Sequence, residues 1–140
     1  MLRKFHLAAW AMVAGIGLIS QPAWSLTVVD IMATIKSEAK QDNPTFTEFS
    51  ATRGEQFFKT KHGSEWSCSS CHTDNPTALG KHAKTGKDIQ PFAPSANPER
   101  FTDESKVAKW FKRNCKDVLD RVCTPQEKGD VLAYLITVKK

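Results

Sequence analysis

The sequence predicts one small, all-α domain. Apolar residues recur at helical spacing near both ends of the expected domain. Two stretches in the second half, 102–104 and 124–127, carry residues that typically begin helices. Between these regions lies a Cys-x-x-Cys-His sequence at residues 68–72, followed by a loop-rich stretch. A core this small is marginal by itself, so we expect the helices to pack around a group that this motif binds.

Residues 1–25 have the pattern of a secretory signal peptide. Arg3 and Lys4 form a positively charged start, and residues 7–20 form an apolar run without charge. Ala23 and Ser25 supply small residues at the cleavage positions. Because the apolar run is short for a membrane span, we expect cleavage after Ser25 and export of a domain at residues 26–140.

Two helices are expected before the motif. The first covers residues 27–40 and ends at Asn43-Pro44. Its apolar residues at helical spacing are Val28, Ile31, Met32 and Ile35. The second covers residues 50–60 and contains Gly54, which we expect to let the last helix approach closely near Tyr134.

Two more helices are expected after the motif. Residues 73–98 hold four of the chain's seven prolines and are predicted to be loop. Thr102 is expected to cap the third helix, with Asp103 and Glu104 in its first turn, where the helix dipole favours anions. Residues 124–127, Thr-Pro-Gln-Glu, form a capping box that opens the last helix. One face of that helix is apolar: Val131, Leu132, Leu135 and Ile136.

The charge pattern argues against nucleic acid as a partner. The chain carries a net charge of +5, and removal of Arg3 and Lys4 leaves 18 basic and 15 acidic residues. A nucleic-acid-binding surface would show a basic stripe with interleaved aromatic residues, which the sequence lacks. The basic clusters at 59–62 and 81–82 are more typical of solvated loops than of docking sites.

Cys68-Ser69-Ser70-Cys71-His72 is the sequence by which c-type haem is attached. One helical turn separates Cys68 from Cys71, so both sulfurs can add to the vinyl groups along one edge of the haem. His72 is then placed under the iron as its fifth ligand. In bacteria this attachment takes place outside the cytoplasm, which agrees with the signal peptide and indicates the periplasm.

Two other interpretations of the motif fit less well. A four-cysteine zinc site would need a second Cys-x-x-Cys, but Cys115 and Cys123 have seven residues between them. A thioredoxin-like dithiol would need a strand–helix–strand context, which the sequence does not show. One covalent haem c is therefore the expected cofactor. The expected core or haem-pocket aromatics are Trp66, Phe92, Phe101, Trp110 and Phe111, and without haem we expect the chain to be largely unfolded.

The sixth iron ligand is not evident from the usual pattern. Electron-transfer cytochromes commonly use a methionine downstream of the histidine, but the only methionine of residues 26–140 is Met32, on an apolar helical face. His82 and His62 lie in polar, lysine-rich stretches that do not favour ligation. Asn114 shares an inward helix face with Trp110 and Phe111, although a capping role near the helix end is the more common one.

Several blocks resemble the sphaeroides haem protein family, a near relative of cytochrome c double-prime of methylotrophs. Besides residues 68–72, these blocks are Thr-Gly-Lys-Asp-Ile-Gln-Pro-Phe-Ala-Pro-Ser at 85–95 and Arg-Phe-Thr-Asp at 100–103. Trp-Phe-Lys-Arg-Asn-Cys at 110–115 and Cys-Thr-Pro-Gln-Glu-Lys at 123–128 complete the set. The resemblance covers residues 68–135 well and the N-terminal helices only in outline.

The resemblance implies a variant of the class I cytochrome c fold with a disulfide near the haem. It makes His72 the proximal ligand, Asn114 the distal ligand of the oxidised protein, and Cys115–Cys123 the disulfide, which we expect to be structural rather than a redox switch. In cytochrome c double-prime a histidine stands where this chain has Asn114, which favours the sphaeroides haem protein type. The carbonyl of Pro91 or Pro94 is expected to orient the His72 ring.

Two classes of function remain open from the sequence. In the first, the protein transfers electrons and binds O2, NO or CO at a sixth site that opens on reduction; the resemblance implies a dihaem cytochrome c and a membrane cytochrome b as redox partners. In the second, it is a haem enzyme that reduces O2, peroxide or NO. No histidine can be placed on the distal side as an acid–base group, which favours the first class.

Overall fold

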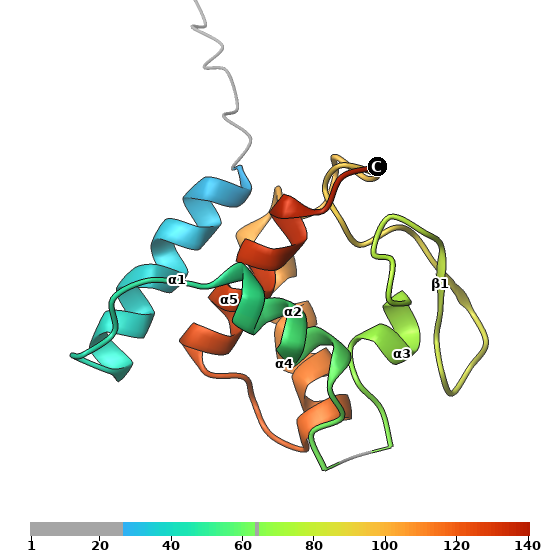
Figure 1. The fold of residues 1–140 in the computed structure, drawn as a ribbon, viewed down its shortest axis with the longest axis horizontal. Helices are drawn as coiled ribbons and strands as arrows, with labels where there is room; N and C mark the ends of the chain where they lie inside the picture. The colour runs from blue at the N-terminus through green and yellow to red at the C-terminus, as the bar shows by residue number, and fades with distance from the viewer. Residues whose placement is uncertain (1–26, 64) are drawn as a thin grey trace, which may run out of the picture.

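The helices surround one core in the computed structural model, which describes residues 27–63 and 65–140 (Figure 1). They are α1 (Val28–Asp42), α2 (Ala51–Lys59), the one-turn α3 (Ser69–His72), α4 (Glu104–Leu119) and α5 (Pro125–Thr137). The predicted signal peptide at 1–25 lies outside the described residues. Within the described residues, no helix is both long enough and apolar enough to cross a bilayer.

The N-terminal boundaries follow the capping signals of the sequence. Thr27 caps α1 with its hydroxyl and Asp30 returns the bond to the Thr27 amide, while Ser50 caps α2. Thr124 and Glu127 form the predicted capping box of α5, with Pro125 at its first position. These side chains satisfy amide groups that a helix start leaves unpaired, so local sequence is enough to set the boundary.

Three details of the sequence interpretation are corrected by the structure. Asp103, rather than Thr102, caps α4, because its carboxylate accepts the Lys106 amide at 3.0 Å. Ile136 is 39% exposed, whereas the other three predicted residues of the α5 face are buried. The stretch predicted as loop contains a short antiparallel pair, β1 (Gly80–Lys81) and β2 (Asp88–Ile89), with Gly80 opposite Ile89.

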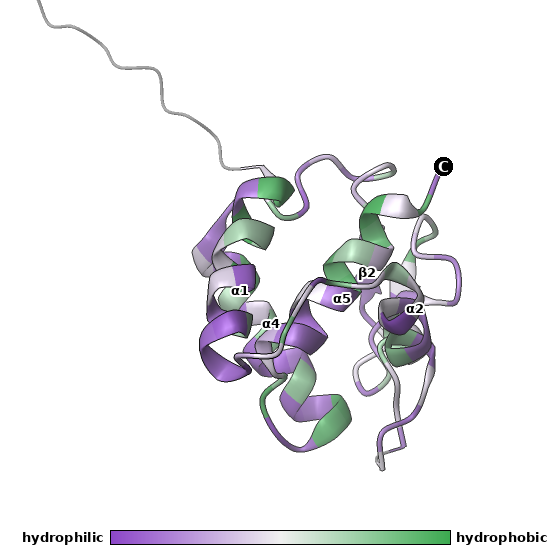
Figure 2. Cartoon of the chain, turned by 60° about the vertical axis from the view of Figure 1, so that its left-hand side comes forward, coloured by the Kyte–Doolittle hydropathy of each residue, from purple (hydrophilic) through white to green (hydrophobic). Residues whose placement is uncertain are grey.

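The core lies where α1 and α2 pack against α5. Its buried members include Ile31 and Ile35 from α1, Phe58 from α2, and Leu132 and Leu135 from α5. In Figure 2, α1 and α4 carry both hydrophilic and hydrophobic residues, as amphipathic helices at the edge of a core do. On α4, Val107 and Phe111 contact this core, and the same side of the helix faces the loops that follow α3.

Gly54 is the point of closest approach between α2 and α5. A Cβ atom at Gly54 would overlap the backbone carbonyl of Asp130, one turn before the predicted contact at Tyr134. Asp130 is buried, and its carboxylate accepts the Ser50 amide at 2.7 Å and the Arg53 Nε at 2.8 Å. The missing side chain and the ion pair therefore fix the same helix crossing.

Gly54→Ala is expected to lower the free energy of unfolding by about 1–3 kcal/mol, because the added methyl group must push α2 away from α5. Urea unfolding of the holo-protein measures the change. Thr52→Ala, at an exposed position of the same helix, is the control and should unfold within about 0.5 kcal/mol of the parent. Equal stability of the Gly54→Ala and parent proteins would contradict the close helix approach.

Candidate haem site

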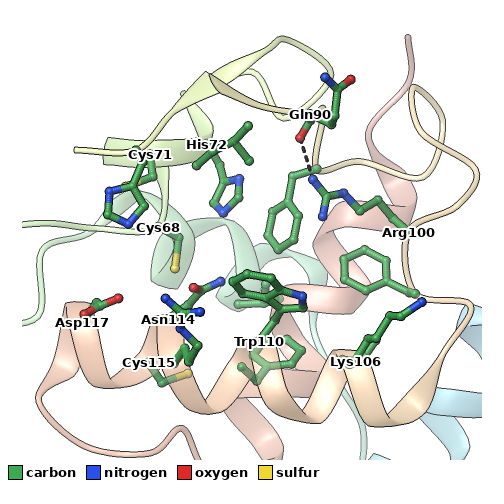
Figure 3. Close-up of a pocket in the computed structure, with 18 of the residues that line it drawn as sticks. Cys68, Cys71, His72, Gln90, Arg100, Lys106, Trp110, Asn114, Cys115 and Asp117 are labelled. Atoms are coloured by element: carbon green, nitrogen blue, oxygen red, sulfur yellow. Dashed lines mark hydrogen bonds between the residues drawn. The ribbon is translucent and has the colours of Figure 1, made fainter. Parts of the chain in front are cut away.

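A cavity of about 630 Å³ separates the Cys-x-x-Cys-His turn from α4 (Figure 3). Its walls come from residues 67–72, the loop at 82–103, the inward face of α4, and single residues of the α5 region. Cavities that hold drug-sized molecules and cofactors typically measure about 300–1,000 Å³. Four of the five aromatics predicted for the core or haem pocket line it: Phe92, Phe101, Trp110 and Phe111. The fifth, Trp66, instead lies under the Lys84 ammonium group, 4.6 Å from its ring centre.

The motif residues form one tight helical turn. The amides of Cys71 and His72 donate to the Cys68 carbonyl at 3.2 and 3.0 Å. Ser67 and Ser70 bond each other's amides through their hydroxyls, which holds the start of the turn. Cys68 and Cys71 are free thiols, and both line the cavity. Burial raises the pKa of the Cys68 thiol to about 12, so this group stays a neutral thiol at physiological pH.

His72 enters the cavity as a neutral imidazole. Its ring stacks on Phe92 with centroids 4.1 Å apart, and burial together with the nearby Arg100 charge lowers its pKa to about 4. Its Nδ1 is buried and has no hydrogen-bond partner among the described residues. Neither Pro91 nor Pro94 therefore accepts the bond that we expected to orient the ring; the Pro91 carbonyl instead accepts the Arg100 Nε at 2.9 Å.

The structure separates the candidates for a sixth ligand. Asn114 lines the cavity from α4, facing the side that carries His72 (Figure 3). His82 also lines it, but its Nδ1 accepts hydrogen bonds from the amides of Lys84 and Thr85 at 3.3 Å. In this tautomer the ring proton is on Nε2, so neither nitrogen has a free lone pair with which to bind iron. His62 donates Nε2–H to the Phe57 carbonyl, Met32 packs against the core, and neither is among the lining residues.

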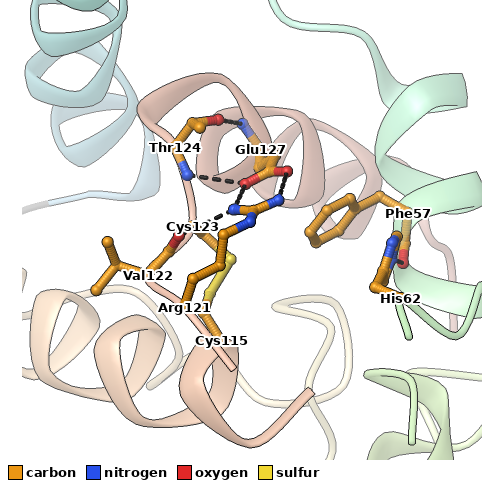
Figure 4. The surroundings of a disulfide bond; sticks show 8 residues. All are labelled: Phe57, His62, Cys115, Arg121, Val122, Cys123, Thr124 and Glu127. Carbon is orange, nitrogen blue, oxygen red and sulfur yellow. Dashed lines mark hydrogen bonds and ion pairs between the residues drawn. A yellow bond between two sulfur atoms is a disulfide. The ribbon is translucent and has the colours of Figure 1, made fainter. Parts of the chain in front are cut away.

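Cys115 and Cys123 form the predicted disulfide (Figure 4). Cys115 follows Asn114 directly on α4, and both half-cystines are buried. The loop that they close is held a second time by Glu127, whose carboxylate pairs with Arg121 at 2.7 Å and accepts the Thr124 amide at 2.8 Å. The end of α4 that carries Asn114 is thus fastened to the start of α5.

The alternative of a zinc site receives no support from the geometry. Among residues 27–63 and 65–140, no three side chains of His, Cys, Asp or Glu gather closely enough to hold a metal ion.

The chain is similar to a group of c-type cytochromes. Residues 44–135 match a family model described as a domain of unknown function, DUF1924. Cytochrome c'' of Methylophilus methylotrophus is 45% identical over 106 residues, which are 73% of this chain and 74% of that protein. The chain belongs to the family of cytochrome c'' and the sphaeroides haem protein.

Other members agree in sequence and in fold. The cytochrome c-type protein SHP of Cereibacter sphaeroides is 54% identical over 69 residues, about half of each chain (49% and 53%). The crystal structure of oxidised cytochrome c'' superposes with a TM-score of 0.71 at 41% identity, over 81% of this chain and 95% of the other. The structure of oxidised SHP, described as an oxygen-binding cytochrome c, gives 0.72 at 37% identity, over 81% and 99%.

Haem c is the cofactor of this family of cytochromes, and the residues of this chain fit it. Both thiols are free, and they line one cavity together with the neutral imidazole. Two thiols one helical turn apart and a neighbouring imidazole are the side chains that form the thioether bonds and the iron bond of haem c.

Arg100 is a further residue of the site that sequence reasoning missed. Its Nε and Nη2 donate to the carbonyls of Pro91 and Gln90 at 2.9 and 2.7 Å, and its guanidinium lies 5.6 Å from the Phe92 ring centre. It lines the cavity and forms no ion pair with a carboxylate of the described residues. Burial lowers its pKa, although it stays charged.

An unpaired cation in a cavity calls for an anionic group of the molecule that fills it. Haem carries two propionates on the edge opposite its vinyl groups. In Figure 3, Arg100 and Lys106 lie at the end of the cavity away from Cys68 and Cys71. Arg100 is therefore the residue best placed to pair with a haem propionate. In the sequence, Arg100 was noticeable only as the first residue of the family block at 100–103, and nothing in that block indicated that it would line the haem cavity.

Replacing both half-cystines by alanine (Cys115→Ala with Cys123→Ala) is expected to lower the free energy of unfolding by roughly 2–3 kcal/mol, because the short loop regains its freedom in the unfolded chain. Urea unfolding of the holo-protein measures this loss. Arg121→Gln, which breaks the exposed ion pair of the same loop and keeps the disulfide, should cost less than about 1 kcal/mol. An unchanged urea midpoint of the double variant would show that the disulfide is not a structural staple.

Arg100→Gln is expected to lower the reduction potential of the haem, because a lost positive charge makes the more positive ferric state easier to form. We expect a fall of about 59 mV, which for one electron equals a tenfold change in the ratio of oxidised to reduced protein. Potentiometric titration measures it. Lys81→Gln removes the same charge at an exposed position outside the cavity and should leave the potential nearly unchanged. Equal shifts in both variants would contradict a specific role of Arg100.

Proposed function

We propose that this chain is a periplasmic monohaem cytochrome that transfers electrons and binds a diatomic ligand at a position held by Asn114 when oxidised. The observation that carries the proposal is the place of Asn114, on the cavity wall that faces His72. Of the two other histidines, His62 lies outside the cavity lining, and His82 has its Nδ1 bonded to backbone amides. The fold is then a variant of the class I cytochrome c fold, as a mainly helical chain around one haem.

Four side chains would hold the haem. Cys68 and Cys71 would add their S–H groups across the two vinyl double bonds, a step that forms two C–S bonds and needs no oxidant. His72 would supply the proximal ring nitrogen, kept neutral by its burial. Arg100 would pair with a propionate at the far edge. When bound, the haem supplies an iron that takes and gives one electron and accepts a sixth ligand.

Asn114 suits a ligand that leaves on reduction. An amide oxygen is a hard, neutral and weak donor, which favours ferric iron over the softer ferrous iron. The side chain is half-buried and forms no hydrogen bond to another side chain in the described residues, so its release breaks none of those contacts. The neighbouring Cys115–Cys123 disulfide holds the backbone, so we expect the side chain, rather than α4 as a whole, to move.

The descriptions of the relatives support the binding of a small ligand, but they name no redox partner. SHP is described as an oxygen-binding cytochrome c, and the solution structure of cytochrome c'' is described as giving insight into detachment of a haem ligand. By this similarity we propose O2, NO or CO as ligands of the ferrous protein. We further propose a dihaem cytochrome c and a membrane cytochrome b as redox partners, in the compartment that the predicted signal peptide indicates.

One observation favours a second function, the reduction of O2, peroxide or NO. Asp117 and Arg113 line the cavity near Asn114, and an exposed carboxyl group at this place can relay protons from solvent to a ligand that is being reduced. Steady-state turnover of peroxide or NO above that of free haem would support the enzyme. Turnover that Asp117→Asn leaves unchanged would show that this carboxylate takes no part.

Visible spectra of the ferric protein, of the ferrous protein under argon, and of the ferrous protein with CO test the proposal. A ferric low-spin or mixed form that becomes high-spin on reduction and binds CO at once is expected. A ferrous form that stays low-spin and ignores CO would mean a firm sixth ligand and a plain electron carrier.

Asn114→His is expected to give a low-spin, six-coordinate ferric haem and weaker access for ligands of the ferrous haem, because imidazole competes for iron better than an amide does. CO association with the ferrous variant should slow by about tenfold or more, equivalent to about 1.4 kcal/mol. Stopped-flow mixing with CO measures the rate. Asn97→His, another cavity-lining asparagine that lies on the loop rather than on α4, is the control and should retain the parent's rate. An unchanged rate in Asn114→His would contradict the role of Asn114.

A further inference from the structure

A second, small pocket lies between α1 and α4. We call it the α1–α4 pocket, with a volume of about 40 Å³. Its apolar walls come from both helices: Ile31, Ile35, Val107, Ala108 and Phe111. The polar residues at its edge are Thr34, Glu38, Glu104 and Lys128, of which Glu38 and Lys128 pair at 3.6 Å.

The α1–α4 pocket and the haem cavity share part of their lining. Val107 and Phe111 line both spaces. Both stand on α4, and Phe111 precedes Asn114 by three residues, so it neighbours Asn114 on the helix surface. The pocket therefore adjoins the part of the haem cavity that α4 lines, from which Asn114 also faces inward.

Size and chemistry restrict what this pocket can hold. A space of 40 Å³ exceeds the 10–15 Å³ that one water needs, but it admits no drug-sized molecule. The charged side chains lie at its edge, whereas its inner walls of Ile31, Ile35, Val107 and Phe111 offer water no hydrogen bonds. Apolar surfaces of this kind take up xenon or similar guests.

We propose that the α1–α4 pocket is a docking site for apolar diatomic molecules, O2, NO or CO, and their entry point to the distal side of the haem. The molecule would pass between the side chains of Val107 and Phe111, which line both spaces. This proposal rests on the proposed function, in which a diatomic takes the position that Asn114 leaves.

Filling the pocket tests the route. Ala108→Phe and Thr34→Phe place a ring into the pocket from α4 and from α1, at two exposed positions that should tolerate it. Ala33→Phe is the matched control, since Ala33 is exposed on α1 and lines neither space. Flash photolysis of the ferrous CO complex gives the association rate, and displacement of CO by NO gives the dissociation rate.

Both filled variants are expected to bind and to release CO about threefold or more slowly, with an unchanged equilibrium constant. A barrier on a path slows entry and exit by the same factor, whereas a disturbed haem site changes the affinity. Phe111→Ala should speed both rates. Parent-like rates in both filled variants, or an association rate that falls while dissociation does not, would overturn the route.

Xenon provides a readout that does not depend on haem ligation. Under xenon pressure, methyl signals of Ile31, Ile35 and Val107 should shift in the parent protein and stay in place in Ala108→Phe. Absence of these shifts in the parent overturns the docking site. If the parent's ferrous form binds no CO at all, the proposed function fails, and the xenon shifts still decide whether the pocket takes a small apolar guest.

Discussion

The contact between α2 and α5 is the constraint on which the rest of the structure depends. Gly54 lets the two helices meet backbone to backbone, and the buried Asp130 carboxylate ties them through Arg53 and the Ser50 amide. A buried carboxylate is tolerated because its oxygens are paired and bonded. This crossing places Phe58, which is fully buried, against Tyr134 on one side and toward the haem cavity on the other.

The two sides of the cavity are held by different means. On the proximal side, Phe58 lies 6.1 Å from Phe92, Phe92 stacks on His72, and Arg100 covers Phe92 while bonding the loop at residues 90–91. On the distal side, the disulfide fastens the end of α4, and Val107 and Phe111 join its inward face to the core. The Asn114 side chain takes no part in the aromatic stack around His72. This division suits the haem that we propose, with one fixed and one releasable ligand.

Local rules predicted the helices well, and the few errors have physical causes. Capping residues set the starts of α1, α2 and α5 because they bond amides within three residues of themselves, which sequence alone can show. At α4, Thr102 and Asp103 were both suitable, and the backbone geometry chose Asp103. Residues 73–98 contain β1 and β2 despite their prolines, since the turn from His82 to Lys87 pairs two short strands that no pattern of alternating residues announced.

By itself, the sequence determined the haem-attachment turn, the helical face that carries Asn114 and the pairing of the two remaining cysteines, because each depends on residues close together in the chain or on a specific family block. Only the tertiary structure decided which candidates reach the cavity. His82 and His62 are engaged by neighbouring backbone groups, Arg100 faces the cavity without a counter-charge, and α1 meets α4 with a small gap beside the distal side. Such features arise from segments far apart in the sequence, whose distances are set by how the helices pack.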